Sequence, residues 1–218
     1  MIVKNPVSDV STEIQQLATP TWKRGVDLIG AFVATPLLSP LLLVVALYIR
    51  LVSPGPVLFV QSRVGHGGED FRIYKFRTMH VPRQSRDDQH REYVAGLASG
   101  EGPASKPEFE NELIPGGNLL RKLSIDELPQ LLNVFRGNMS LVGPRPDVLR
   151  LEDYEEWQVQ RFEVLPGMTG LWQVSGKNRL SFDEMIELDV RYIETRSLTN
   201  DLSIIARTVR VLLFERNE

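Results

Sequence analysis

The chain has 218 residues, which allows one compact domain plus an appendage. Apolar residues make up 42% and charged residues 24%, a balance that is ordinary for a folded protein and argues against global disorder. The net charge of −3 argues against a general nucleic-acid binder, so we expect no nucleic acid as a partner. The chain has no cysteine, which excludes disulfides, thiolate zinc sites and a cysteine nucleophile.

Residues 1–21 are polar and show no strong pattern, and we interpret them as a polar N-terminal lead-in. The predicted helix 22–52 follows, and its residues 28–49 are an uncharged apolar run. A straight helix needs about 20 apolar residues to cross the core of a bilayer, so this run is long enough. A buried core helix is the alternative, but such a helix normally has a polar face and this run has none. We therefore interpret 22–52 as a membrane segment.

The membrane segment contains Pro36 and Pro40, and Ser39 directly precedes the second proline. An interior proline removes a backbone hydrogen bond and kinks a helix, and a serine can donate to the freed carbonyl. Basic residues lie on both sides of the run, so positive charge does not favour carrying either end across the bilayer. The residues alone leave open a re-entrant helix bent at Ser39-Pro40 and a spanning helix with a tolerated kink. The flanking basic residues are Lys23, Arg24, Arg50 and Arg63.

Residues 53–218 are predicted to form the main folded domain. Two short segments rich in β-formers, 57–61 and 71–76, are separated by a glycine-rich turn, and this pattern predicts a β-hairpin. Residues 81–112 are polar with clustered glycine and proline, which predicts a long mobile loop.

Four helices are predicted after this loop, at about 119–134, 153–162, 182–193 and 202–213. Pro129 lies inside the first and argues for a break or a fresh start there. The last helix either packs on the core or lies in the membrane interface. We expect an α/β fold that is rich in helix and has a small β-hairpin or sheet. The apolar faces are Phe182, Ile186, Val190 and Ile193 in the third helix, and Leu202, Ile205, Val209, Leu212 and Leu213 in the last.

Asp126 and Glu127 are adjacent carboxylates that closely follow Arg121 and Lys122. On a helix the two acids point about 100° apart, so they cannot share a proton but can take separate roles. One can act as a nucleophile or base, and the other can bind a hard cation such as Mg²⁺, while Arg121 and Lys122 are suited to hold phosphate. The alternative is a solvated acid pair at the start of a helix.

Arg145 lies between two prolines in residues 143–146, which makes it a pre-set bidentate clamp for phosphate. Lys75 and Arg77 alternate with apolar residues, as in a strand that faces an anionic substrate or lipid headgroups. The alternatives are a structural loop with an exposed arginine and a surface hairpin with charged edges.

The segment 166–176 contains glycines that allow close approach of the backbone, together with Trp172 and Gln173. These two side chains are suited to contact a base or a sugar, although a tryptophan buried in a turn-rich core is the commoner case. The chain contains no HExxH, Walker A, GxGxxG or GxSxG motif, which argues against a metalloprotease, a P-loop NTPase and a serine hydrolase.

Seven short motifs follow one another within about residues 23–213. They are Lys23-Arg24-x-x-Asp27, Ser39-Pro40, Ser53-Pro54-Gly55-Pro56-Val57, Lys75-Phe76-Arg77-Thr78-Met79, Leu123-Ser124-x-Asp126-Glu127-Leu128-Pro129-Gln130, Val142-Gly143-Pro144-Arg145-Pro146 and Pro166-Gly167-x-Thr169-Gly170-x-Trp172-Gln173. Each motif is weak alone, but in this order and spacing the chain resembles the monotopic phosphoglycosyl transferases, also called bacterial sugar transferases.

The resemblance implies that Asp126 attacks the β-phosphate of a UDP-sugar and that UMP leaves. Undecaprenyl phosphate, or another polyprenyl phosphate, then attacks the phosphosugar-aspartyl intermediate and yields a polyprenyl diphosphate sugar. Mg²⁺ is the implied cofactor, held by Glu127 together with Asp126. We assign phosphate binding to Arg145, Arg121, Lys75 and Arg77, and nucleotide or sugar contacts to Trp172, Gln173 and Lys177.

The resemblance also implies that the break at Ser39-Pro40 returns the helix to the leaflet that it entered. Both termini and the catalytic domain 53–218 would then face the cytoplasm at the bacterial inner membrane, with membrane lipids as partners. The implied pathways are the assembly of surface glycans, exopolysaccharide, O-antigen or glycoprotein glycans. The chain looks like the minimal catalytic form of the family, or a piece of a longer member, and a homodimer is one option for its assembly.

The chain departs from the family pattern at Lys177, where members often carry arginine, and near Arg196 and Thr199, where they often carry aromatic residues. Two other functions stay open. A hydrolase of polyprenyl diphosphates would use the same acid pair but need no nucleotide, and a membrane scaffold would tolerate replacement of Asp126 and Arg145. The sequence does not identify the sugar, because a few pocket contacts decide that choice.

Overall fold

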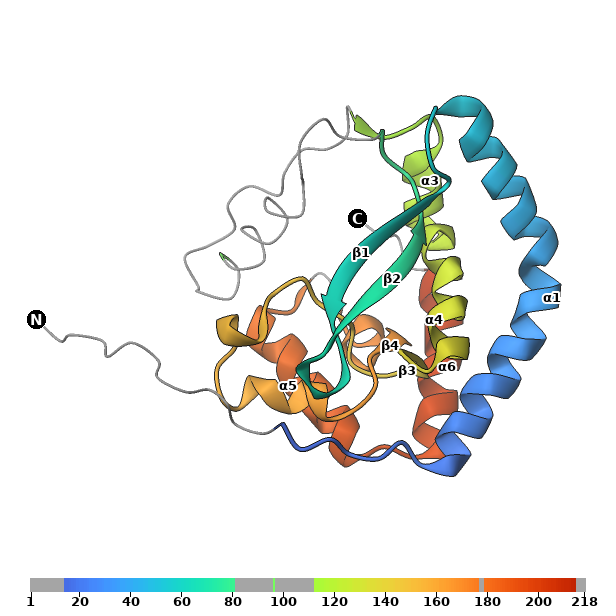
Figure 1. Cartoon of the computed structure of the whole chain (residues 1–218). Helices are drawn as coiled ribbons and strands as arrows, with labels where there is room; N and C mark the ends of the chain where they lie inside the picture. Colours follow the sequence, from blue (N-terminus) through green and yellow to red (C-terminus); the bar gives the residue numbers. More distant parts are fainter. Residues whose placement is uncertain (1–13, 81–95, 97–111, 177–178, 215–218) are drawn as a thin grey trace, which may run out of the picture.

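The computed structural model of the chain describes residues 14–80, 96, 112–176 and 179–214. Most of the predicted loop at 81–112, most of the lead-in and Lys177 lie outside these residues. Figure 1 shows the long helix α1 (Thr21–Val52) arching along one side, next to the column that contains α3 (Gly117–Lys122) and α4 (Leu131–Arg136). The hairpin of β1 (Leu58–Val64) and β2 (Asp70–Phe76) crosses the centre of the same view.

Helix α1 runs without interruption through both prolines, and its ribbon bows away from the rest of the molecule in Figure 1. Pro40 has no N–H to donate to the carbonyl of Pro36, and the hydroxyl of Ser39 donates to that carbonyl at 2.9 Å instead. The outward face of the helix is exposed, with Phe32 73% and Leu37 74% accessible. Within the described residues, α1 is the one helix long and apolar enough to cross a membrane.

Both ends of α1 pack on the folded domain. Near its start, Ala31 is buried against Ile73 and Val134. Near its end, Val45 and Ile49 are buried in a second apolar cluster with Phe76, Ile114 and Leu120. Because the two clusters include β2, α3 and α4, and because Leu38 and Leu42 in the middle of α1 also pack against them, one face of the helix lies on the core along its length.

The predicted β-hairpin is confirmed. β1 and β2 pair antiparallel from Leu58 opposite Phe76 to Val64 opposite Asp70. The connecting turn needs glycine, because Gly67 and Gly68 both have positive φ, at 68° and 78°. A second sheet that the sequence did not predict pairs β3 (Ser140–Val142) with β4 (Gly167–Thr169) in parallel.

The predicted helix at 119–134 is wrong as a single element. α3 ends at Lys122, Ser124 has a left-handed φ of 52°, and a 3-10 helix η3 (Ile125–Gln130) leads into α4. The break therefore lies before Ile125, and the fresh start predicted near Pro129 corresponds to α4, which begins at Leu131. Pro129 lies inside η3 as its fifth residue, directly before the junction with α4, where it removes one backbone N–H from the short 3-10 helix.

The segment predicted as a helix at 153–162 forms two 3-10 helices, η4 (Leu151–Asp153) and η5 (Gln158–Glu163). Val159 and Phe162 are both buried, and their spacing of three matches the period of a 3-10 helix. The segment is therefore helical in two short pieces, but of the 3-10 type.

The two C-terminal helices are present as α5 (Phe182–Glu194) and α6 (Leu198–Phe214). Ser181 caps α5 by accepting a hydrogen bond from the N–H of Glu184. The apolar face predicted for α6 packs on the core only in part: Ile205 contacts a buried cluster, whereas Leu202 and Val209 are each 52% exposed. The buried face consists of Asp201, Ile204 and Val211 in α6, and of Phe182, Ile186, Asp189 and Tyr192 in α5.

Candidate active site

The carboxylates of Asp126 and Glu127 lie on η3, directly after the strained backbone of Ser124. A 3-10 helix has three residues per turn, so neighbouring side chains point about 120° apart. Strand β2 packs along η3, which brings Lys75 to the acid pair across 52 residues of sequence. A left-handed serine costs of order 1–3 kcal/mol and is found where the surrounding structure imposes it, often at functional sites.

Glu127 is fully engaged by two basic side chains. Its Oε1 accepts from Lys75 Nζ at 2.8 Å and from Arg145 Nη2 at 2.5 Å, and its Oε2 accepts from Arg145 Nη1 at 3.1 Å. Burial alone raises the pKa of Glu127, but the charges of Arg145 and Lys75 hold it well below its ordinary value. Glu127 is therefore ionised and paired with two cations.

Asp126 has the opposite environment. It is 9% exposed, and no described group forms a hydrogen bond or an ion pair with its carboxylate. Burial, aided by the charge of Glu127, raises the pKa of the Asp126 carboxyl to about 6. The more distant charges of Lys75, Arg121 and Arg145 oppose this rise without forming bonds to the carboxylate. The result is a buried carboxylate that is ionised at neutral pH and has no bonded partner among the described groups.

Arg145 is aimed at the pair by a rigid loop. The N–H of Gly143 donates to the carbonyl of Thr169 at 2.9 Å, and the N–H of Gly167 donates to the carbonyl of Pro144 at 2.8 Å. A Cβ at Gly143 would lie 2.5 Å from the carbonyl oxygen of Leu165, so the two chain segments can approach this closely only with glycine there. These glycines serve the packing of the loop that carries Arg145.

Arg121 and Arg77 differ in where they point. Arg121 Nε donates to Thr78 Oγ1 at 2.9 Å, and its charge acts on Asp126. Arg77 is 5% exposed and donates to the carbonyls of Ser53 and Pro54 at 2.7 and 2.6 Å. The structure thus brings Lys75, Arg145 and Arg121 around the acids, whereas the guanidinium of Arg77 holds the turn that ends α1.

Trp172 and Gln173 lie on the short 3-10 helix η6 (Trp172–Val174). Trp172 Nε1 and Gln173 Oε1 are buried without a hydrogen-bond partner among the described groups. Neither residue contacts the acid pair through a hydrogen bond of the described structure. Their predicted contacts with a nucleotide or a sugar stay predictions.

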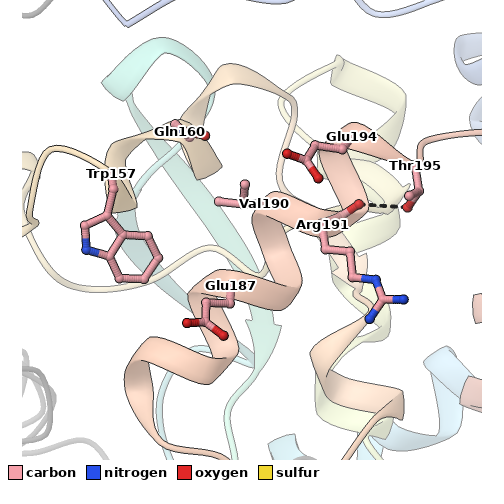
Figure 2. Close-up of a pocket in the computed structure, with 7 residues that line it drawn as sticks. All are labelled: Trp157, Gln160, Glu187, Val190, Arg191, Glu194 and Thr195. Carbon is pink, nitrogen blue, oxygen red and sulfur yellow. Dashed lines mark hydrogen bonds between the residues drawn. The ribbon is translucent and has the colours of Figure 1, made fainter.

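Two cavities of the described structure lie away from the acid pair. One, of about 410 Å³, is lined by Trp157, which directly precedes η5, and by α5 side chains that include Val190 and Glu194. Figure 2 shows the aromatic ring of Trp157 at one end of it. The other, of about 420 Å³, is lined by Leu171, Arg207 and others. Because Asp126 and Glu127 line neither, we place the candidate active site by its chemistry rather than by concavity.

One buried network was missed from the sequence. Lys23 Nζ donates to Asp201 Oδ2 at 2.6 Å and to the carbonyl of Val142 at 2.8 Å. Tyr192 donates to the same carboxylate and the same carbonyl, and the nearby Asp27 accepts from the N–H of Leu141 at 2.9 Å. The network ties the start of α1 to the strand that leads into the Arg145 loop. The only sequence signal was a lysine and an aspartate four residues apart at the head of an apolar helix.

Comparison with known proteins gives a consistent picture. The family model described as "Bacterial sugar transferase" matches residues 18–215. The chain is 42% identical over 215 residues to the UDP-glucose:undecaprenyl-phosphate glucose-1-phosphate transferase of Caulobacter vibrioides, covering 94% of this chain and 74% of that protein.

A second relative is the UDP-N-acetylgalactosamine-undecaprenyl-phosphate N-acetylgalactosaminephosphotransferase of Aeromonas hydrophila, which is 40% identical over 88% of this chain. The chain spans only 43% of the length of that relative. A third is the exopolysaccharide production protein ExoY of Rhizobium meliloti, which is 39% identical over 89% of this chain and 86% of its own length.

Proposed function

Because the chain belongs to the bacterial sugar transferase family, we propose that it moves a sugar-1-phosphate from a UDP-sugar to undecaprenyl phosphate or another polyprenyl phosphate. The products are UMP and a polyprenyl diphosphate sugar. The observation that carries the proposal is the contrast between the two acids: Glu127 is held by two cations, and Asp126 is buried but unbonded.

The first half of the proposed reaction forms a bond between an Asp126 oxygen and the β-phosphorus of the UDP-sugar. The bond between that phosphorus and the bridging oxygen to the α-phosphate breaks, and UMP leaves with the electron pair. In the second half, an oxygen of the polyprenyl phosphate attacks the same phosphorus and the Asp126–phosphorus bond breaks. The carboxylate returns to its starting state, so no oxidant, reductant or net proton is required.

The surrounding cations support the handling of a diphosphate. Lys75, Arg121 and Arg145 carry three positive charges, of which Glu127 balances one and the ionised Asp126 another. The remaining positive charge attracts a phosphate toward Asp126. Without it, the carboxylate of Asp126 would repel that phosphate. Arg145 has the planar fork that binds two phosphate oxygens at once.

The acid pair is compatible with Mg²⁺. The described residues contain no cluster of three histidine or acidic side chains, but Mg²⁺ commonly takes one or two carboxylates and completes its shell with water and substrate phosphates. Asp126 has no competing bond, and Glu127 Oε2 has a single contact, with Arg145 at 3.1 Å. A carboxylate oxygen of Asp126 and Oε2 of Glu127 would hold the Mg²⁺ ion. When bound, the ion would neutralise negative charge on the substrate phosphates.

We propose that α1 is re-entrant, with the catalytic domain on the cytoplasmic side of the inner membrane. A straight helix of 32 residues is about 48 Å long, so a spanning helix would place its ends on opposite sides of the bilayer. Both ends of α1 instead contact one folded domain, and the ribbon between them bows outward in Figure 1. In sequence, Ser39 and Pro40 lie between the two ends. The exposed apolar stripe of α6, with Leu202 and Val209, supports contact with the same leaflet.

The test is an assay of UMP release. The purified protein in detergent or nanodiscs is incubated with undecaprenyl phosphate and each of a panel of UDP-sugars. Release of UMP that requires the nucleotide sugar and is lost in the Asp126→Asn variant supports the proposal. The UDP-sugar that gives this release identifies the sugar. Release of inorganic phosphate from a polyprenyl diphosphate without nucleotide would instead assign a hydrolase, and absence of both reactions would point to a scaffold.

A further inference from the structure

A second arginine, Arg161 of η5, contacts the backbone of the loop that carries Arg145. Arg161 Nη2 donates to the carbonyl oxygen of Arg145 at 2.7 Å and to Asp189 Oδ2 of α5 at 2.8 Å. Its Nη1 donates to the hydroxyl of Tyr154 at 3.1 Å and lies 3.6 Å from Asp147 Oδ2. One guanidinium therefore joins the residue of the clamp, the residue two positions after it, and helix α5.

These contacts complete the support of the Arg145 backbone. On its N-terminal side, the hydrogen bonds from Gly143 to Thr169 and from Gly167 to Pro144 tie the loop to β4. On its C-terminal side, the carbonyl of Arg145 accepts from Arg161, and the carboxylate of Asp147 interacts with both Arg161 and the hydroxyl of Tyr154, which Arg161 also contacts. A rigid, planar guanidinium can serve both positions at once, which the single ammonium of a lysine cannot.

Arg161 cannot itself touch a substrate. Its side chain is 4% exposed and that of Asp189 is 1% exposed. Two charges buried this deeply must be paired, because an isolated buried charge is strongly destabilising. A pair of apolar residues would fill such a space at lower desolvation cost, so the charged pair calls for a role besides packing.

We infer that Arg161, held by Asp189, is a positioning residue that sets the backbone of Arg145 and thereby aims its guanidinium at Glu127 and at the substrate phosphates. The inference rests on the proposed function, in which Arg145 clamps phosphate. Arg161 acts only through Arg145, so Arg161 contributes to the rate of UMP release only while the guanidinium of Arg145 is present.

A double-mutant cycle tests this dependence. Arg161→Lys keeps the charge that neutralises Asp189 but removes the second donor nitrogen. We expect kcat/KM for UMP release to fall about tenfold, since a small displacement of a clamp is costly, with Tm changed by only a few degrees. In an Arg145→Lys background, the same substitution should lower kcat/KM by less than about threefold, because the fork that it positions is already gone.

The outcomes separate the inference from the proposed function. Suppose that Arg145→Lys is impaired and that Arg161→Lys lowers kcat/KM by the same factor in the unchanged protein and in the Arg145→Lys variant. The two effects are then additive, and the positioning role is wrong. If Arg145→Lys alone leaves UMP release unchanged, Arg145 is not a clamp and the positioning inference falls, while the UMP release itself still supports the proposed function. If the unchanged protein releases no UMP, the proposed function falls. Arg150→Lys, a substitution at an arginine whose side chain is 62% exposed, is the matched control and should leave every rate unchanged.

A second variant keeps the test valid if Arg161→Lys does not fold. Asp189→Asn retains an oxygen that accepts from Arg161 but loses the charge, so Arg161 stays in place with a weaker hold. We expect a smaller fall in kcat/KM that also disappears in the Arg145→Lys background. A fall of equal size in both backgrounds would overturn the inference.

Discussion

Glu127 receives both ends of the Arg145 guanidinium, at 2.5 and 3.1 Å, in the fork geometry that an arginine uses for a phosphate. The carboxylate of Glu127 thus occupies the clamp in the absence of substrate, while the adjacent Asp126 stays unbonded. Glu127 and Asp126 should therefore respond differently to substitution.

Asp126→Asn should abolish UMP release, by at least about a thousandfold, including release in the absence of lipid acceptor. The amide cannot form the acyl phosphate, although it fills the same space. UMP release by the purified variant, with and without undecaprenyl phosphate, is the measurement. Asp70→Asn, at an exposed position of β2, should behave like the unchanged protein. Normal turnover of the Asp126 variant would disprove its role as nucleophile.

The same substitution should not destabilise the fold. The folded pKa of Asp126, about 6, lies above its ordinary value of 3.8, so the native state binds more protons than the unfolded state between these values. Stability from this group therefore falls as the pH rises through that window and stays reduced at pH 7. The amide of Asp126→Asn has no charge to desolvate, and we expect the Tm of this variant at pH 7.5 to equal or exceed that of the unchanged protein. A Tm lowered by several degrees would contradict this account.

The activity should depend on pH through Asp126. The reactive form is the carboxylate, so kcat/KM for UMP release should be level above about pH 6 and fall about tenfold for each pH unit below it. The profile is best measured under saturating lipid acceptor, with enzyme returned to pH 7.5 afterwards to exclude irreversible loss. A rate that is unchanged down to pH 5 would show that Asp126 is not the titrating nucleophile.

Glu127→Gln should lower activity by roughly 10–100-fold and change its dependence on Mg²⁺. The amide keeps the shape but offers Arg145 and Lys75 no charge, and it is a poorer ligand for a hard cation. UMP release is measured across a titration of Mg²⁺ for both proteins. If the half-saturating concentration does not move, Glu127 is not a ligand of the metal and its role is confined to holding Arg145 and Lys75.

Asp201→Asn should loosen the start of α1. The change leaves Lys23, which is 3% exposed, without its closest counter-charge, and breaking a buried pair costs about 3–5 kcal/mol. A fall in Tm in detergent is the measurement, with Glu194→Gln on the exposed side of α5 as the control. A Tm equal to that of the control would show that Asp27 alone holds the lysine.

Pro40→Ala should straighten α1, because residue 40 regains an N–H that can bond the carbonyl of Pro36. We expect part of the population to place its N-terminus across the bilayer. The chain has no cysteine, so Lys4→Cys provides a single labelling site for a membrane-impermeant reagent applied from outside. Labelling only in the Pro40→Ala background supports the proposed topology. Protection in both backgrounds would mean that proline alone does not set it.

The local patterns of the sequence predicted the hairpin and the residues of the acid and basic clusters. The alternation of β-formers around glycines is a short-range signal, and β1 and β2 follow it. The meeting of Lys75 with Glu127 depends on how β2 packs against η3, and no local pattern describes such packing. The parallel pair β3–β4 was missed because each strand has only three residues and both lie among prolines and glycines.

The error in α6 has a different cause. Its apolar residues Leu202 and Val209 mark a regular face, but the face that packs on the core contains Asp201. An aspartate is acceptable there because Lys23, 178 residues away in the sequence, supplies its counter-charge. Single-sequence reasoning treats a charge as exposed by default, and so it also missed Arg161 and Asp189.

The docking of both ends of α1 has a practical consequence for anyone who wants a water-soluble enzyme. Ala31 covers Ile73 and Val134, and Val45 and Ile49 cover Phe76 and Leu120. Deleting the helix would expose both of these apolar clusters to solvent, and the remainder should aggregate. Solubility would have to come from polar substitutions at outward positions such as Phe32 and Leu37, which leave those clusters covered.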